Sequence, residues 1–195
     1  LIVISSTIST STVIENNTVA NLFNNYRGTS TSGYVRVFYA TSGVNTIVGN
    51  MVYNLANMSP QTGTTTSASV LGIGQTSTTA GQTVSQNTVH SLSNQSATGA
   101  VIAIGIYYSG PSTGQNIVSR NFVHSIALAT TSTTATITGI QLAGGNGHIR
   151  NNMVRLGIDA AGNSLTTEYE LTGIYKSASA STTGIGVYFN SVYIG

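Results

Sequence analysis

Short runs of β-branched residues alternate with polar, hydroxyl-rich stretches along the chain, without the 3.6-residue spacing of an amphipathic helix. Within these runs one pattern recurs: Ile or Val, two residues, Asn, one residue, and Val. Successive copies place their Asn 33, 37, 34, 31 and 38 positions apart. The six copies centre on Asn17, Asn50, Asn87, Asn121, Asn152 and Asn190. A repeat of this length built from β-branched segments predicts an all-β solenoid with one coil per repeat.

The Asn of each copy is expected to mark a corner of its coil. The flanking Ile or Val and the final Val are five positions apart, so in a straight strand they would face opposite sides. Both reach one core only if the chain bends between them, and Asn tolerates left-handed backbone angles. We therefore expect the six Asn side chains to stack as an amide ladder.

The remainder of each repeat is less regular. A Leu or Ile follows three positions after the Val in the first four copies, whereas Gly157 and Gly195 stand there in the last two, so these coils are expected to bend differently. A second element combines a small residue and Gly with an apolar stretch. Its glycines are Gly33, Gly72, Gly99, Gly139 and Gly173. Thr-rich tracts of variable length, such as 61–69 and 129–136, are expected to be loops.

Together these features resemble the right-handed parallel β-helix, the solenoid of pectate-lyase-like proteins. They are most similar to the secreted, Thr/Ser/Asn-rich surface repeat proteins of bacteria, especially of the Bacteroidetes type. The resemblance covers residues 13–194 and implies about six coils in a single repeat array over residues 1–195, interpreted as a piece of a longer chain. It also implies an extracellular or cell-surface location. It does not select a function, because this fold hosts lyases, hydrolases, adhesins, fibres and ice binders.

The composition excludes several classes of protein. Ser and Thr number 25 and 30, charged residues are only 5%, and 40% of the chain is hydrophobic, which disfavours intrinsic disorder. A net charge of +2 on so few charges predicts no nucleic-acid patch. The most apolar run, residues 100–108, is far shorter than the roughly 20 residues of a membrane-spanning helix, so no membrane span is expected. The chain has no Cys, which excludes disulfides and thiolate metal sites.

Catalytic chemistry finds little support in the sequence. Glycoside hydrolysis usually needs two facing carboxylates, and the lyases and hydrolases that this fold hosts are expected to carry clustered acids. The acidic residues are Glu15, Asp159, Glu168 and Glu170. Only the last two are close in sequence, and one coil cannot place both sides of a substrate. We therefore expect no enzyme activity, no cofactor and no metal.

One outward column is a candidate binding stripe. If the Val two positions after each Asn points inward, the next residue points outward. From the second coil onward, that position holds Tyr53, His90, His124, Arg155 and Tyr193. Stacked on neighbouring coils, these side chains could bind a glycan by ring stacking and polar contacts, bind a neighbouring molecule, or simply stabilise the sheet surface. A metal site at the two His is disfavoured because no third ligand is visible.

The leading hypothesis from the sequence is a structural or adhesive surface module, a rigid stalk or a filament formed by head-to-tail self-association. The alternative is a carbohydrate-binding module that uses the stripe. Ice binding comes third, because Thr134, Thr136 and Thr138 alternate but the Thr tracts vary in length and register.

Overall fold

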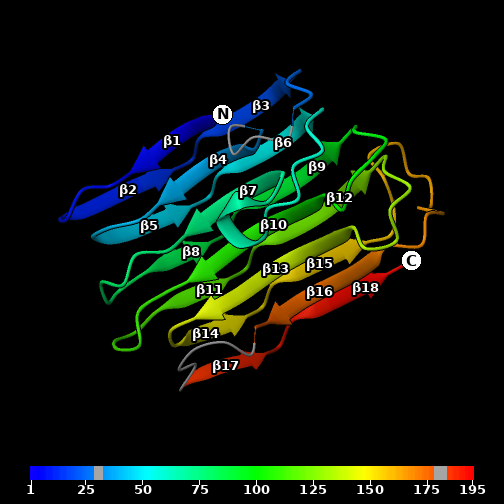
Figure 1. The fold of residues 1–195 in the computed structure, drawn as a ribbon. Coiled ribbons are helices and arrows are strands. Elements are labelled where there is room, and N and C mark those ends of the chain that lie inside the picture. The colour runs from blue at the N-terminus through cyan, green and yellow to red at the C-terminus, as the bar shows by residue number, and fades with distance from the viewer. Residues whose placement is uncertain (29–32, 178–183) are drawn as a thin grey trace.

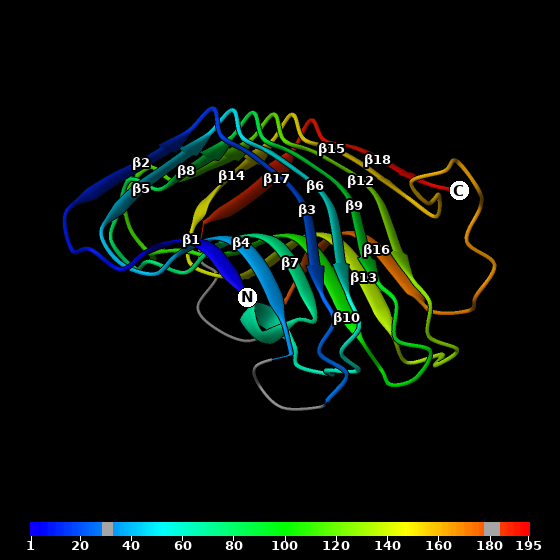
Figure 2. The same cartoon turned by 90° about the horizontal axis from the view of Figure 1, so that it is seen from above.

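A computed structural model describes residues 1–28, 33–177 and 184–195 of the chain. In these ranges the strands form three parallel sheets of six strands each (Figure 1). Every coil passes through sheet 1, sheet 2 and sheet 3 in turn, as the view along the solenoid shows (Figure 2). The predicted all-β parallel β-helix is therefore confirmed.

Sheet 1 consists of β1 (Ile2–Ser6), β4 (Val35–Ala40), β7 (Val70–Gln75), β10 (Ile102–Ser109), β13 (Thr136–Gly144) and β16 (Glu170–Lys176). Sheet 2 consists of β2 (Ser11–Glu15), β5 (Val44–Val48), β8 (Thr83–Ser85), β11 (Ile117–Ser119), β14 (Gly147–Arg150) and β17 (Ile185–Tyr188). Sheet 3 consists of β3 (Thr18–Asn24), β6 (Met51–Asn57), β9 (Thr88–Asn94), β12 (Phe122–Leu128), β15 (Met153–Leu156) and β18 (Ser191–Ile194).

The chain turns between sheets 2 and 3 beside the predicted Asn residues, but the backbone conformation of the turn differs from the prediction. The left-handed residue is the one before each ladder Asn, not the Asn itself. These residues, with φ between +55° and +67°, are Asn16, Gly49, Gln86, Arg120, Asn151 and Phe189. The bend is thus made one position earlier, which leaves each Asn side chain free to reach along the stack.

A column of glycines lets sheet 1 approach sheet 3 closely. A Cβ on any of them would clash with the inward Val of the corner pattern in the same coil. The column consists of Gly72, Gly105, Gly139 and Gly173. Three of the five glycines of the Gly element, Gly72, Gly139 and Gly173, belong to this column. Gly33 precedes β4 and Gly99 lies in the loop beside Pro60, so these two copies do not contribute to it.

The last two coils differ from the others, as expected. Sheet 3 strands β15 and β18 have four residues, whereas β3, β6, β9 and β12 have seven. Gly157 follows β15 with a left-handed φ of +85°, where the earlier coils place an apolar side chain. The chain leaves the sheet there instead of continuing along the core.

The Thr-rich tract between β6 and β7 folds over the outer face of sheet 1 and includes the short 3-10 helix η1 (Thr65–Ser67) (Figure 2). It covers a small apolar cluster outside the main core, formed by Ala68, Leu71, Ile104 and Tyr107. Among the described residues, no helix is long and apolar enough to cross a membrane.

Candidate functional site

The corner Asn residues form a continuous amide ladder. Asn87 is representative: its Nδ2 donates to Asn121 Oδ1 at 2.9 Å and to the carbonyl oxygen of Ile47 at 2.9 Å, and its backbone N donates to Asn121 Oδ1 at 3.1 Å. The side-chain bond repeats at every step from Asn17 to Asn190, at 2.9 to 3.0 Å. The four central amides are at most 1% exposed. The predicted ladder is therefore confirmed.

Two further corners carry amides that sequence reasoning missed. Where sheet 1 turns into sheet 2, Asn45 Nδ2 donates to Gln82 Oε1 at 3.1 Å, and Gln82 N donates to Asn116 Oδ1 at 3.0 Å. Where sheet 3 turns into sheet 1, Asn24 Nδ2 donates to Asn57 Oδ1 at 3.1 Å. Amides thus join neighbouring coils at all three corners.

The sequence contains a signal for the amide column at the corner between sheet 3 and sheet 1. Asn24, Asn57 and Asn94 each lie seven positions after a ladder Asn. Asn57 and Asn94 are buried, and their Nδ2 groups donate to backbone carbonyls of the turn into sheet 1. Their constant position, seven residues after a ladder Asn, would have identified them. The column between sheet 1 and sheet 2 was harder to recognise, because Gln82 stands there in place of an Asn.

The candidate binding stripe is brought together in one column of sheet 3. Strand register pairs Tyr53 with His90, His90 with His124, His124 with Arg155, and Arg155 with Tyr193. The rings of Tyr53 and His90 stack at 5.1 Å and those of His90 and His124 at 4.7 Å, both with an interplanar angle of 1°. We call these five residues the sheet 3 stripe.

Polar contacts orient the two imidazoles. Each His places Nδ1 2.9 Å from the Oγ of the following Ser, Ser91 or Ser125. Arg155 Nη2 also donates to Ser125 Oγ, at 3.2 Å. Partial burial lowers the pKa of His90, and burial together with the charges of His90 and Arg155 lowers the pKa of His124 to about 4. Both rings are therefore neutral at pH 7.

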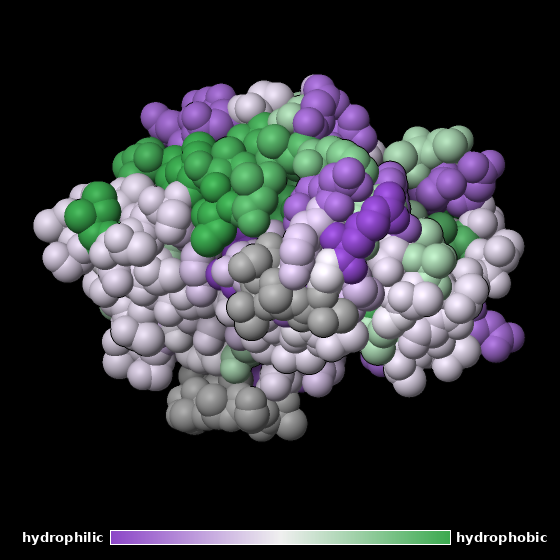
Figure 3. Space-filling model, turned by 45° about the horizontal axis from the view of Figure 1, so that its top comes forward, coloured by the Kyte–Doolittle hydropathy of each residue, from purple (hydrophilic) through white to green (hydrophobic). Residues whose placement is uncertain are grey.

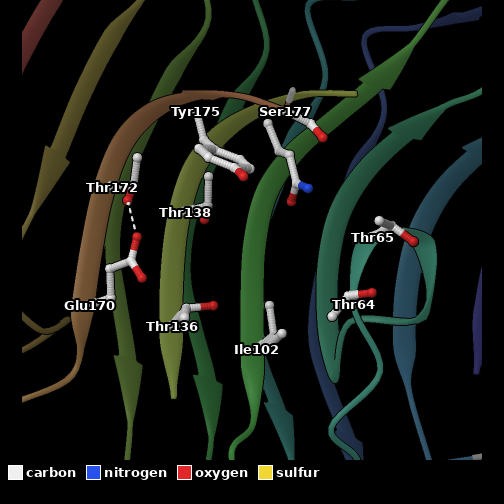
Figure 4. A pocket seen from close by; sticks show the side chains of 10 residues that line it. Thr64, Thr65, Ile102, Thr136, Thr138, Glu170, Thr172, Tyr175 and Ser177 are labelled. Atoms are coloured by element: carbon white, nitrogen blue, oxygen red, sulfur yellow. Dashed lines mark hydrogen bonds between the residues drawn. The ribbon is translucent and has the colours of Figure 1, made fainter. Parts of the chain in front are cut away.

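A second candidate site is a groove on the outer face of sheet 1, beside the η1 loop (Figure 4). It has a volume of about 280 Å³. Its walls are largely hydroxyl and amide groups, among them Thr136, Thr138, Gln141 and Thr172, together with the carboxylate of Glu170 and the half-exposed ring of Tyr175. The sequence did not single out these residues, because they meet only when β10, β13 and β16 lie side by side.

The acidic residues are distributed over several coils, and only Glu168 and Glu170 are neighbours in sequence. Glu15 lies in β2 of the first coil and Glu170 in β16 of the last. Asp159 sits in a turn, where Oδ1 accepts from the backbone N–H groups of Ala161 and Asn163 at 2.8 Å. No group of three His, Cys, Asp or Glu suited to a metal ion occurs in the described ranges.

We compared the chain with protein families, curated proteins and solved structures. No protein-family model, no curated protein and no solved structure matches the chain. The class defined by the fold is the parallel β-solenoid with stacked coils.

Proposed function

We propose that this chain is a noncatalytic structural or adhesive module, a rigid extracellular solenoid that serves as a stalk or filament segment. The observation that carries the proposal is the amide ladder that runs through all six coils. Buried amides bonded in series polarise one another and resist slippage of one coil past the next. The resemblance of the repeat to secreted bacterial surface proteins supports the location.

The positions of the carboxylates support a noncatalytic role. Acid–base cleavage of glycans uses two carboxyl groups a few ångströms apart on either side of the bond. Here Glu15 and Glu170 belong to the first and last coils, and Glu170 Oε1 accepts a hydrogen bond from Thr172 Oγ1 at 3.1 Å.

The end coils support head-to-tail association. Apolar side chains gather on the end of the solenoid formed by the first coil (Figure 3), where Leu1, Ile2 and Val3 are 39 to 49% exposed. At the other end Val192 and Ile194 are 47% and 48% exposed. Open strand edges with apolar side chains favour pairing with another coil, and a contact between unlike ends that does not close a ring makes a filament.

Sedimentation velocity over a range of concentrations tests this association. We expect the sedimentation coefficient to rise with concentration, and Ile194→Lys to abolish the rise because it places a charge in the end contact. Thr131→Lys, which adds the same charge on a lateral exposed loop, is the matched control and is expected to behave like the unmodified chain. A monomer at every concentration, or an equal effect of both substitutions, would reject the filament role.

The groove on sheet 1 favours a second candidate function, the binding of a neutral glycan. Hydroxyl and amide groups beside an aromatic ring suit a polar ligand rich in hydroxyls. Tyr175→Ala is expected to reduce retardation of the chain in gels that contain a neutral polysaccharide. Phe23→Ala, which removes a similarly exposed ring outside both the groove and the sheet 3 stripe, is the control. Equal retardation of both variants would count against a glycan site in the groove.

A further inference from the structure

The sheet 3 stripe presents ring edges rather than ring faces. His90 lies between Tyr53 and His124, with centroid distances of 5.1 and 4.7 Å, so neighbouring side chains cover both of its faces. Phe122 also lies against His124, at 4.3 Å. A sugar therefore cannot stack on these imidazoles, and the ring-stacking mode expected from the sequence does not fit the His pair. Only the polar edges remain available.

The hydrogen bonds favour the tautomer of His124 in which the outer edge of the imidazole donates. A guanidinium can only donate, so Ser125 Oγ accepts from Arg155 Nη2 and its own proton is free for His124 Nδ1. In the tautomer whose Nδ1 accepts from Ser125, the neutral ring carries its proton on Nε2. His90 has the same contact with Ser91, which favours the same tautomer.

The charged side chains around the sheet 3 stripe are positive. None of the six strands of sheet 3 contains Asp or Glu, and the charged side chain in the column is Arg155. The buried Nε of Arg155 has no hydrogen-bond partner. His90, His124 and Arg155 thus form a row of donor side chains on successive coils, roughly 4.8 Å apart, with no carboxylate in the strands of sheet 3.

We propose that the sheet 3 stripe binds an acidic polysaccharide that lies along the solenoid axis, so that its carboxylates accept from the edges of His90, His124 and Arg155. Charge complementarity selects this occupant: the row offers donors and a cation, and a linear polyanion offers repeated acceptors. The proposal goes beyond the scaffold role and does not depend on filament formation. A surface module with this stripe would hold an acidic matrix.

Binding should strengthen in mild acid. The charged or titratable groups that face the two imidazoles are Tyr53, Arg155 and the imidazoles themselves. Burial and the neighbouring cations hold the pKa of His124 near 4 in the free protein, and a bound carboxylate would offset that repulsion. Protonation and anion binding therefore favour each other.

Affinity electrophoresis in gels containing carboxymethylcellulose or hydroxyethylcellulose, at pH 7 and pH 5, tests the proposal. The two polymers share a backbone and differ in charge. We expect retardation by carboxymethylcellulose only, stronger at pH 5. Arg155→Gln should weaken binding about tenfold, as for loss of one charge-assisted hydrogen bond. Arg150→Gln, which removes an exposed Arg from sheet 2, should have little effect.

Three results would overturn the proposal. Equal retardation by both polymers would mean that sugar hydroxyls, not charge, are recognised. An equal loss in Arg150→Gln would mean that binding follows net charge. Binding to duplex DNA without binding to carboxymethylcellulose would assign the stripe to nucleic acid. If Arg155→Gln proves unstable, Arg155→Lys should bind nearly as well as the unmodified chain, and the pH dependence of the unmodified chain tests the imidazoles.

Discussion

A single corner amide joins two neighbouring coils to its own. Asn121 Nδ2 donates to Asn152 Oδ1 in the next coil and to the carbonyl oxygen of Val84 in the preceding one, both at 3.0 Å. Its Oδ1 accepts two bonds from Asn87, from the backbone N and from Nδ2. Because all these groups are buried, the loss of one side chain leaves several polar partners without water.

Replacing Asn121 by Ala is therefore expected to lower the free energy of unfolding by about 1 to 3 kcal/mol, the cost of buried groups left unsatisfied. Urea denaturation followed by circular dichroism measures the change. Thr113→Ala, in an exposed loop, is the control and is expected to have an effect within about 0.5 kcal/mol. Equal effects of the two substitutions would show that the ladder does not stabilise the fold.

Because of the two imidazoles of the sheet 3 stripe, we expect the protein to lose stability in mild acid. Burial, His90 and Arg155 lower the pKa of His124 from its ordinary value of 6.5 to about 4, and burial lowers that of His90. The unfolded chain therefore binds more protons than the folded chain between about pH 6.5 and 4, and stability falls as the pH falls through that window. The melting temperature, measured at intervals across it, should decrease. A variant with both His90→Gln and His124→Gln should show a flatter dependence, and an unchanged slope would contradict this assignment.

At the scale of the strand, the sequence predicts the repeated strands and corners better than the contacts between neighbouring coils. The periodic Asn and Val gave the parallel β-helix and the ladder, because one residue type recurs wherever the same environment recurs. The glycine column was only partly predicted, since the third copy of the Gly element holds two glycines, Gly99 before β10 and Gly105 within it, and only packing against sheet 3 selects the second. The groove could not be predicted, because Thr138 and Thr172 differ from other threonines only in their neighbours.

Gly139 tests the close approach of sheets 1 and 3. A Cβ there would clash with Val154 Cγ1 and lie 2.6 Å from the carbonyl oxygen of Gly173. Gly139→Ala should therefore cost about 1 to 3 kcal/mol through overpacking. Gly144, in the same strand, is the matched control, because the nearest atom to its Cβ would be Ser109 Oγ at 3.2 Å. Denaturation midpoints that fall equally for both alanine variants would refute the packing argument.

At the scale of the whole molecule, the coils form one continuous stack. The main core runs from Ile14 in the first coil to Tyr169, just before β16 of the sixth, and amides join neighbouring coils at the three corners. In a solenoid each coil contacts only its neighbours, so stiffness depends on every interface between coils. A ladder that repeats without interruption therefore suits the proposed role of a rigid scaffold.

Hydrogen exchange of side-chain amides by NMR tests the central claim, that buried corner amides bond the coils into one stack. We predict slow exchange of the Nδ2 protons of Asn50, Asn87, Asn121 and Asn152, with rates near those of global unfolding. The exposed amide of Asn163 should exchange rapidly. Exchange of the corner amides as fast as that of Asn163 would contradict the account, because it would mean that the ladder is open to water.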